Sequence, residues 1–376
     1  MTTNITSITA VRLTGAASRD RLPLLVVGPS LGTSALALWS DCAEHLTDRF
    51  DVLAWDLPGH GYNTGVPAEP FTVADLAAAL LGVVDEVMVQ RGTPHDAFAI
   101  AGNSAGGVVA LQVLLDAPER VASAVLLCTP AGPGDTAAWD ERIAQVRNGG
   151  TDALVEAATE RWFGPGFVER EPARTASLQR ALRSVSAAGY VGVCEALASY
   201  DVRDRLGEIA APVLVVAGEH DRAVTPAAAQ QVADGVQDGR TVVLDGVAHL
   251  PPAEVPAEVA TLIRHHVLGE PDSTTDPEHT EQTEQAAHAL VADHAAGRIG
   301  DRPGLDRRSR SLVALATLVG RSDDELFADQ VRSARSQGLT GPEIEEALLQ
   351  TAVHVGVADA ATAVRIARAA FEEERP

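Results

Sequence analysis

The chain contains no lysine, so its 29 basic residues other than histidine are all arginine. Aspartate and glutamate together number 52, which gives a formal charge of −23 at pH 7. A surface this acidic repels phosphate backbones and anionic lipids, which argues against a nucleic-acid or membrane partner. It would also repel an anionic substrate at long range, so a carboxylate ligand would require a local arginine or oriented backbone N–H groups.

Cysteine is scarce and long apolar runs are missing. Cys42, Cys128 and Cys194 are far apart and form no Cys-x-x-Cys pair, which is typical of small core residues in a reducing compartment. No apolar run reaches about 18 residues, and residues 1–12 lack the basic and apolar regions of a signal peptide. We therefore expect a cytoplasmic protein with no membrane partner, no metal and no cofactor.

Short apolar runs alternate with helical patterns over the first part of the chain. The runs are residues 22–27, 51–55, 97–101, 122–128, 212–217 and 241–244. This alternation predicts an α/β fold with a parallel sheet that is covered on both faces. Residues 131–200, approximately, break the rhythm because they are helical throughout, and we interpret them as a cap inserted between two strands.

A change of composition near Gly269 indicates a domain boundary. Residues 269–284 are polar and predict a linker between an α/β domain at 1–268 and a small all-helical domain at 285–376. Capping-box patterns at 322–325 and 340–343 mark helix starts, and Gly338 suits the end of the helix between them. A helical domain this short has a thin hydrophobic core. We therefore expect its apolar helix faces to be buried against other copies of the chain or against the first domain.

The sequence Gly102-Asn103-Ser104-Ala105-Gly106 follows one of the apolar runs and opens a helix. In this Gly-x-Ser-x-Gly spacing, small neighbours allow a strained backbone that exposes the serine hydroxyl. The helix that follows directs its unpaired N–H groups toward the serine, where negative charge develops in acyl transfer. Ser104 is therefore a candidate nucleophile, although an ordinary serine in a glycine-rich turn would fit the same five residues.

A nucleophilic serine needs a base and an acid that orients the base. Asp221 and His249 lie in the turns that follow two later strands, and such turns meet at one edge of a parallel sheet. Their order after Ser104 is that of an α/β-hydrolase. Taken singly, each could be an ordinary turn or core residue, but jointly they predict a triad. His60 is the rival base, and its Gly-His-Gly turn favours a structural role.

An oxyanion hole needs two N–H donors. We expect Ala105 to supply one, because it follows the nucleophile directly, and Leu31, in the loop after an early strand, to supply the other. Trp139 and Trp162 are candidate substrate-binding residues of the cap, with core packing as the alternative for each.

The loop Ser30-Leu31-Gly32-Thr33 and the segment Arg161-Trp162-Phe163 are the more specific of several motifs within residues 10–265. With the serine turn, residues 139–143 and residues 248–250, they resemble the 3-oxoadipate enol-lactonases of the β-ketoadipate (protocatechuate) pathway, which are α/β-hydrolases. The resemblance implies hydrolysis of a small lactone without a cofactor, either through an acyl-enzyme on Ser104 or by direct attack of water. The alternatives are another ester or C–C bond hydrolase of this fold and a catalytically silent binding protein.

Residues 302–312 and 343–352 resemble the carboxymuconolactone decarboxylases. The product of those enzymes is the substrate of the enol-lactonases, so the resemblance implies a bifunctional chain with Arg307, Glu346 and His354 as candidate residues. The chain departs from the family at Gln330, where a histidine is usual, and at 354–361. Two interpretations stay open for this domain: an active decarboxylase, or a retained module for homo-oligomerisation or docking.

Overall fold

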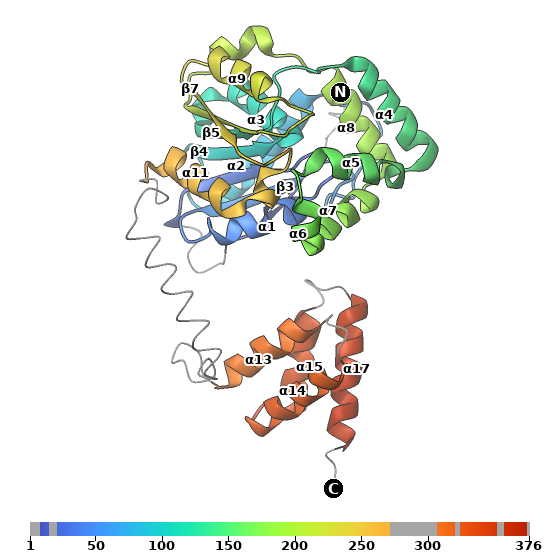
Figure 1. Cartoon of the computed structure of the whole chain (residues 1–376). Helices are drawn as coiled ribbons and strands as arrows, with labels where there is room; N and C mark the ends of the chain where they lie inside the picture. Colours follow the sequence, from blue (N-terminus) through green and yellow to red (C-terminus); the bar gives the residue numbers. More distant parts are fainter. Residues whose placement is uncertain (1–7, 15–20, 271–306, 320–323, 352–356, 374–376) are drawn as a thin grey trace. The chain divides into compact units, whose positions relative to one another are not determined.

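The chain forms two compact units, Met1–Ser273 and Thr274–Pro376, each with its own hydrophobic core. A computed structural model describes them over residues 8–14, 21–270, 307–319, 324–351 and 357–373. The first unit contains a seven-stranded sheet with helices on both faces, and the second is helical (Figure 1).

The sheet of the first unit has the strand order β1-β3-β2-β4-β5-β6-β7, and every neighbouring pair is parallel except β1 with β3. Strands β2, β3, β4 and β6 are buried along their whole length, which explains their continuous apolar runs. The register places Gly28 beside Gly102, so the ends of β2 and β4 meet. The strands are β1 (Thr9–Arg12), β2 (Leu24–Gly28), β3 (Asp51–Asp56), β4 (Phe98–Asn103), β5 (Val121–Leu127), β6 (Val213–Gly218) and β7 (Gly239–Leu244).

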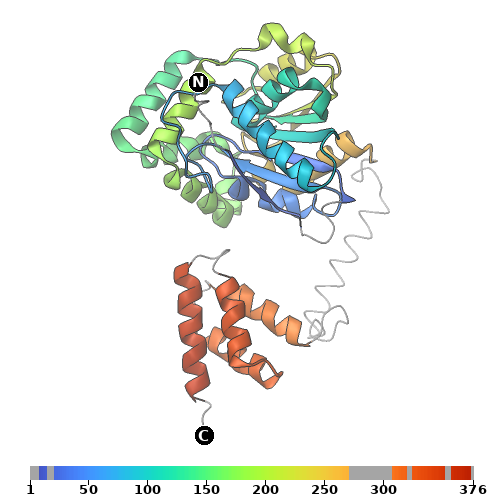
Figure 2. The same ribbon diagram turned by 180° about the vertical axis from the view of Figure 1, so that it is seen from behind.

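Helices cover both faces of this sheet. On one face α1 packs against α10 and α11 (Figure 1), and on the other α2 packs against α3 (Figure 2). The helix α9 packs on β6 and β7. Thr72 and Asp75 form a capping box that starts α2, because each side chain accepts the other's backbone N–H. These helices are α1 (Ala35–Glu44), α2 (Val73–Gln90), α3 (Ala105–Asp116), α9 (Pro226–Gly235), α10 (Pro251–Glu254) and α11 (Pro256–Leu268).

A group of helices is inserted between β5 and β6 and is drawn in green in Figure 1. Within it α4 packs against α8 and α5 against α7, while α7 also contacts α1 of the sheet layer. This group corresponds to the cap expected at residues 131–200. Its helices are α4 (Thr136–Gly149), α5 (Val155–Trp162), α6 (Phe167–Arg170), α7 (Pro172–Ser184) and α8 (Ala187–Ala198).

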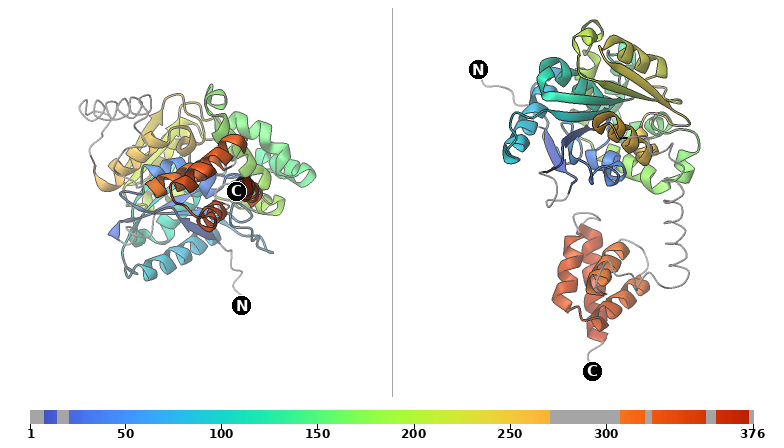
Figure 3. Two further views of the ribbon diagram at one scale, coloured as in Figure 1. Left: turned by 90° about the horizontal axis from the view of Figure 1, so that it is seen from below. Right: turned by 90° about the vertical axis from the view of Figure 1, so that its left-hand side faces the viewer.

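The second unit packs four described helices around a small core, seen from two further directions in Figure 3. The predicted capping box at α15 is confirmed, because Thr340 N donates to Glu343 Oε2 at 2.8 Å. Gly338 has φ +92°, as expected after a helix end. The other predicted box, 322–325, extends outside the described residues. The helices are α13 (Arg307–Leu318), α14 (Asp324–Ser336), α15 (Gly341–Gln350) and α17 (Val357–Glu373).

Two expectations from composition can be compared with the structure. Cys42, Cys128 and Cys194 are free and buried, as predicted for core residues. Over the described residues, none of the helices combines the length and the apolar character that a membrane crossing requires.

Candidate active site

Ser104 occupies the turn between β4 and α3. Its backbone has φ 53° and ψ −112°, a conformation that a residue with a side chain rarely adopts. Two hydrogen bonds hold the turn: Ser104 N donates to Leu127 O at 2.8 Å, and Gly106 N donates to Pro29 O at 2.7 Å. A Cβ atom on Gly102 would lie 2.4 Å from the carbonyl carbon of Gly106, so the turn can close only with glycine there.

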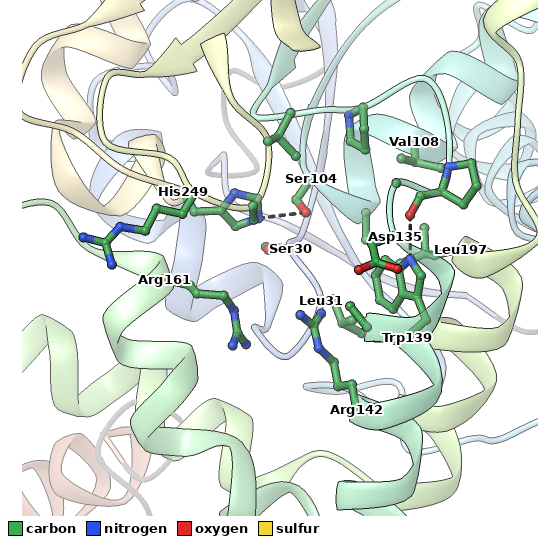
Figure 4. Close-up of a pocket in the computed structure, with 18 of the residues that line it drawn as sticks. Ser30, Leu31, Ser104, Val108, Asp135, Trp139, Arg142, Arg161, Leu197 and His249 are labelled. Carbon is green, nitrogen blue, oxygen red and sulfur yellow. Dashed lines mark hydrogen bonds between the residues drawn. The ribbon is translucent and has the colours of Figure 1, made fainter. Parts of the chain in front are cut away.

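Three side chains from distant segments form a continuous line at this turn. His249 Nε2 lies 3.0 Å from Ser104 Oγ (Figure 4), and His249 Nδ1 lies 2.7 Å from Asp221 Oδ2. The second oxygen of Asp221 accepts the backbone N–H groups of Ala223 and Val224 at 2.8 and 3.0 Å. The structure therefore brings together the three residues that the sequence predicted as a triad.

The charge of Asp221 fits the role of an orienting acid. Burial alone would raise the pKa of this carboxyl, but the charge and hydrogen bond of His249 and the amides of Val224 and Ala223 lower it below its ordinary value. An ionised Asp221 favours the tautomer of His249 with hydrogen on Nδ1, which leaves Nε2 free to accept the proton of Ser104.

His60, the rival base, does not pair with Ser104. It is fully buried, with Nδ1 2.9 Å from Pro58 O and its ring stacked on Tyr190 at 6.2 Å. Burial lowers the pKa of His60 to about 4, so it is neutral at pH 7.

A cavity of about 330 Å³ opens at Ser104, between the sheet edge and the cap. Leu31 and Ala105 line it on the side of the serine turn, and Trp139 and Trp162 line it on the side of the cap. The loop that carries Leu31 is held by Thr33, whose Oγ1 accepts from Ser30 N and donates to Ser30 O. All four predicted residues around the nucleophile thus face the same cavity.

Sequence reasoning missed the positive charge of this cavity. Arg142 and Arg161 of the cap line it, and Figure 4 shows both guanidinium groups in the same part of the cavity. Burial and the nearby charge of Arg142 lower the pKa of Arg161, because two like charges lie close together in a partly desolvated site. Arg142 also stacks on the ring of Trp139 at 4.9 Å. This end of the cavity is suited to a carboxylate.

Asn103 was also not identified from the sequence as a residue of the site, and its neighbours in the sequence give no signal for such a role. Its side-chain nitrogen donates to the carbonyl of His249 at 3.1 Å, which ties the residue before the nucleophile to the histidine loop.

One group among the described residues has the composition of a metal site. Cys128, Asp221 and His249 place three potential ligand atoms within 4.8 Å of one another. However, His249 Nδ1 and Asp221 already bind each other, and burial raises the pKa of the Cys128 thiol, which keeps it protonated. This donor set does not fit a metal ion.

Comparison with known proteins agrees with this geometry. Residues 23–254, more than half of the chain, match the family described as alpha/beta hydrolase fold. The chain belongs to the α/β-hydrolase family. The predicted fold class is thereby confirmed, and residues 285–369 match the carboxymuconolactone decarboxylase family, as the second resemblance implied.

Individual relatives of this α/β-hydrolase include enol-lactonases. The chain is 32% identical over 234 residues to 3-oxoadipate enol-lactonase 2 of Acinetobacter baylyi, a match that covers 62% of this chain and 84% of the relative. The crystal structure of the enol-lactonase from Burkholderia xenovorans LB400 superposes with a TM-score of 0.64 at 28% identity, over 70% of this chain and 96% of that one. A putative carbamate hydrolase RutD of Pseudomonas savastanoi is 28% identical over 235 residues, which are 60% of this chain and 86% of the relative.

The candidate residues of the decarboxylase-like region are described only in part. Glu346 is exposed on α15, where its Oε1 accepts from Gln350 Nε2 at 2.7 Å. Arg307 is the first residue of α13, but its side chain, like the whole of His354, lies outside the described residues. These three residues therefore remain predictions from the sequence.

Proposed function

We propose that this α/β-hydrolase opens 3-oxoadipate enol-lactone to 3-oxoadipate. The observation that carries the proposal is the hydrogen-bonded line Ser104–His249–Asp221, which ends in a cavity that is also lined by Arg142 and Arg161 of the cap. The likeness to enol-lactonases supports the choice of substrate.

The reaction follows from the positions of these groups. His249 takes the hydroxyl proton through Nε2 while Ser104 Oγ attacks the lactone carbonyl, and the amides of Leu31 and Ala105 stabilise the oxyanion. When the ring C–O bond breaks, the leaving oxygen takes the proton from His249 as an enol, which tautomerises to the ketone. Water then gives a proton to His249 and attacks the acyl carbonyl. The bond to Ser104 Oγ breaks as His249 returns the proton to that oxygen, and 3-oxoadipate is released. The same base could instead activate water for direct attack on the lactone.

The substrate carries a carboxylate, which the overall charge of −23 repels. Arg142 and Arg161 offset this repulsion locally, because a guanidinium binds a carboxylate through two parallel hydrogen bonds. We place the substrate carboxylate at these two residues and the lactone carbonyl at Ser104.

The test of the nucleophile is hydrolysis of the enol-lactone by Ser104→Ala. We expect kcat to fall by at least about 10⁴-fold, since removal of a triad nucleophile usually costs several orders of magnitude. Ser184→Ala is the matched control, because Ser184 is exposed on the cap and donates only to Ala181 O. A loss of only a few-fold would contradict a nucleophilic role.

A comparison of substrates separates this proposal from the general esterase alternative. Turnover of the enol-lactone should exceed that of simple aryl esters by orders of magnitude. Equal turnover of both would favour an ester hydrolase of broad specificity.

For the helical domain at 285–376, the family match favours decarboxylation of 4-carboxymuconolactone, whose product would be the substrate of the first domain. Its alternative is a module for homo-oligomerisation. The whole protein supplied with 4-carboxymuconolactone should release carbon dioxide and form 3-oxoadipate. Absence of both products, together with an oligomer that disappears when the domain is removed, would support the second interpretation.

A further inference from the structure

The cap and the histidine loop meet along a short seam, formed by residues 162–164 on one side and by residues 246–250 with Glu254 on the other. The backbone N–H groups of His249 and Leu250 both donate to Trp162 O, at 3.1 and 3.3 Å. The contact is close: a Cβ atom on Gly164 would lie 2.0 Å from Gly246 O. The cap segment that lines the cavity therefore lies directly against the loop that carries the base.

Glu254 bridges this seam with both of its oxygens. Gly164 N donates to Oε2 at 2.6 Å from the cap, and Ala248 N donates to Oε1 at 2.9 Å from the residue before His249. A carboxylate can accept at both oxygens at once. A glutamine of the same shape has one acceptor and one donor, so it would leave one of the two amides facing an N–H group.

We propose that Glu254 is a positioning residue that holds His249 in register with Ser104 and with the cap wall at Arg161 and Trp162. The inference rests on the proposed function, because it assigns Glu254 a part in a reaction carried out by Ser104 and His249. The inference adds a second role for the cap, which would hold the catalytic base His249 in place as well as line the cavity.

The charge of Glu254 also acts on His249. Burial raises the pKa of the Glu254 carboxyl, and the amides of Gly164 and Ala248 and the charge of His249 oppose that rise. On its other side Glu254 lines a separate cavity of about 260 Å³ together with Arg170, His220 and Asp245.

His249 itself is surrounded by further titratable and charged groups. Asp221 binds its Nδ1, Cys128 lies beside it, and Arg161 and Arg222 line the same cavity. Glu254→Gln removes one negative charge from this set of groups and leaves the others in place.

The experiment compares Glu254→Gln with Glu258→Gln. Glu258 is exposed in the first turn of α11, so its variant makes the same charge change away from the seam. For Glu254→Gln we expect kcat for the enol-lactone to fall about 10- to 100-fold with KM changed less than about threefold. The acidic limb of kcat/KM should move to lower pH by roughly half a unit. Glu258→Gln should match the unaltered protein in all three measurements.

Gly164→Ala is the second variant, because it opens the seam from the cap side without changing charge. It should lower kcat like Glu254→Gln but leave the acidic limb in place. A Glu254→Gln protein within twofold of the unaltered protein in kcat, with an unmoved limb, would overturn the positioning role. If that variant does not fold, Gly164→Ala decides, and an unchanged kcat there overturns the role.

A substrate-independent readout separates this inference from the proposed function. A fluorophosphonate probe labels an activated serine whatever the natural substrate is, so its rate of reaction reports on the Ser104–His249 pair. Labelling should be lost in Ser104→Ala and slowed in Glu254→Gln. Labelling that survives in Ser104→Ala would refute the proposed function, whereas loss there with a normal rate in Glu254→Gln would refute only the role of Glu254.

Discussion

The two units of the chain place their polar side chains differently. In the first unit Asp221 and His249 are only 3% and 5% exposed, and each is held by specific partners. In the second unit the described ion pairs, such as Arg308 with Glu343, lie on the surface around an apolar core. Buried polar groups destabilise a fold unless they are partnered, whereas exposed pairs contribute little. The first unit thus holds a preorganised reaction site, whereas the described ion pairs of the second lie on its surface.

The sharpest test of this contrast is Asp221→Asn. The amide can present a hydrogen to Nδ1 and fix His249 in the wrong tautomer, so kcat for the lactone should fall roughly 10⁴-fold. Steady-state kinetics on Asp221→Asn and on Asp238→Asn, an exposed aspartate before β7, would measure it. A variant that keeps a tenth of the activity would show that the buried acid is structural only, and the contrast between the units would weaken.

A smaller effect is expected from Arg142→Ala. Loss of one guanidinium should raise KM for the carboxylate-bearing lactone by about 10- to 100-fold, since a charged hydrogen bond is worth roughly 1.5–3 kcal/mol. A neutral aryl ester should be hydrolysed as before. Arg147→Ala is the control on the same helix, because Arg147 is exposed and pairs with Glu195. An equal loss with both substrates would indicate that Arg142 supports the cap and does not bind the carboxylate.

The smallest effect is expected when the second unit is removed. A chain that ends at residue 270 keeps the whole of the first hydrophobic core, which has no member in common with the second. Its kcat and KM for the enol-lactone should stay within about twofold of the full chain in a direct assay. A tenfold loss would mean that the helical unit completes the lactone site, and the two units could no longer be treated as independent.

The sheet and the serine turn could be predicted because their signals are local. Buried parallel strands give continuous apolar runs, and the spacing of Gly102 and Gly106 around Ser104 is fixed by backbone contact. The edge strand β1 was missed because it has four residues and none of them is fully buried, so its pairing with β3 left no pattern of its own.

The site residues that could not be predicted from the sequence depend on contacts between distant segments. Glu254 accepts a hydrogen bond from Gly164 N, 90 positions earlier in the chain, and Asn103 donates one to His249 O, 146 positions later. Arg142 and Arg161 lie within motifs that carried the family resemblance, but the sequence does not show that folding turns both toward one cavity. Triad residues were easier to find because their types are restricted by the chemistry and their order along the chain by the fold.

The insertion of the cap between β5 and β6 affects how the protein is made. Ser104 leaves the ribosome 145 residues ahead of His249, and all the cap helices are synthesised in between. A nascent chain that already displays its serine turn has no base to activate it, so a product that stalls or terminates before residue 249 lacks the Ser104–His249 pair. Because of this order of synthesis, a reactive serine does not appear during translation before the helices that enclose its cavity have been made.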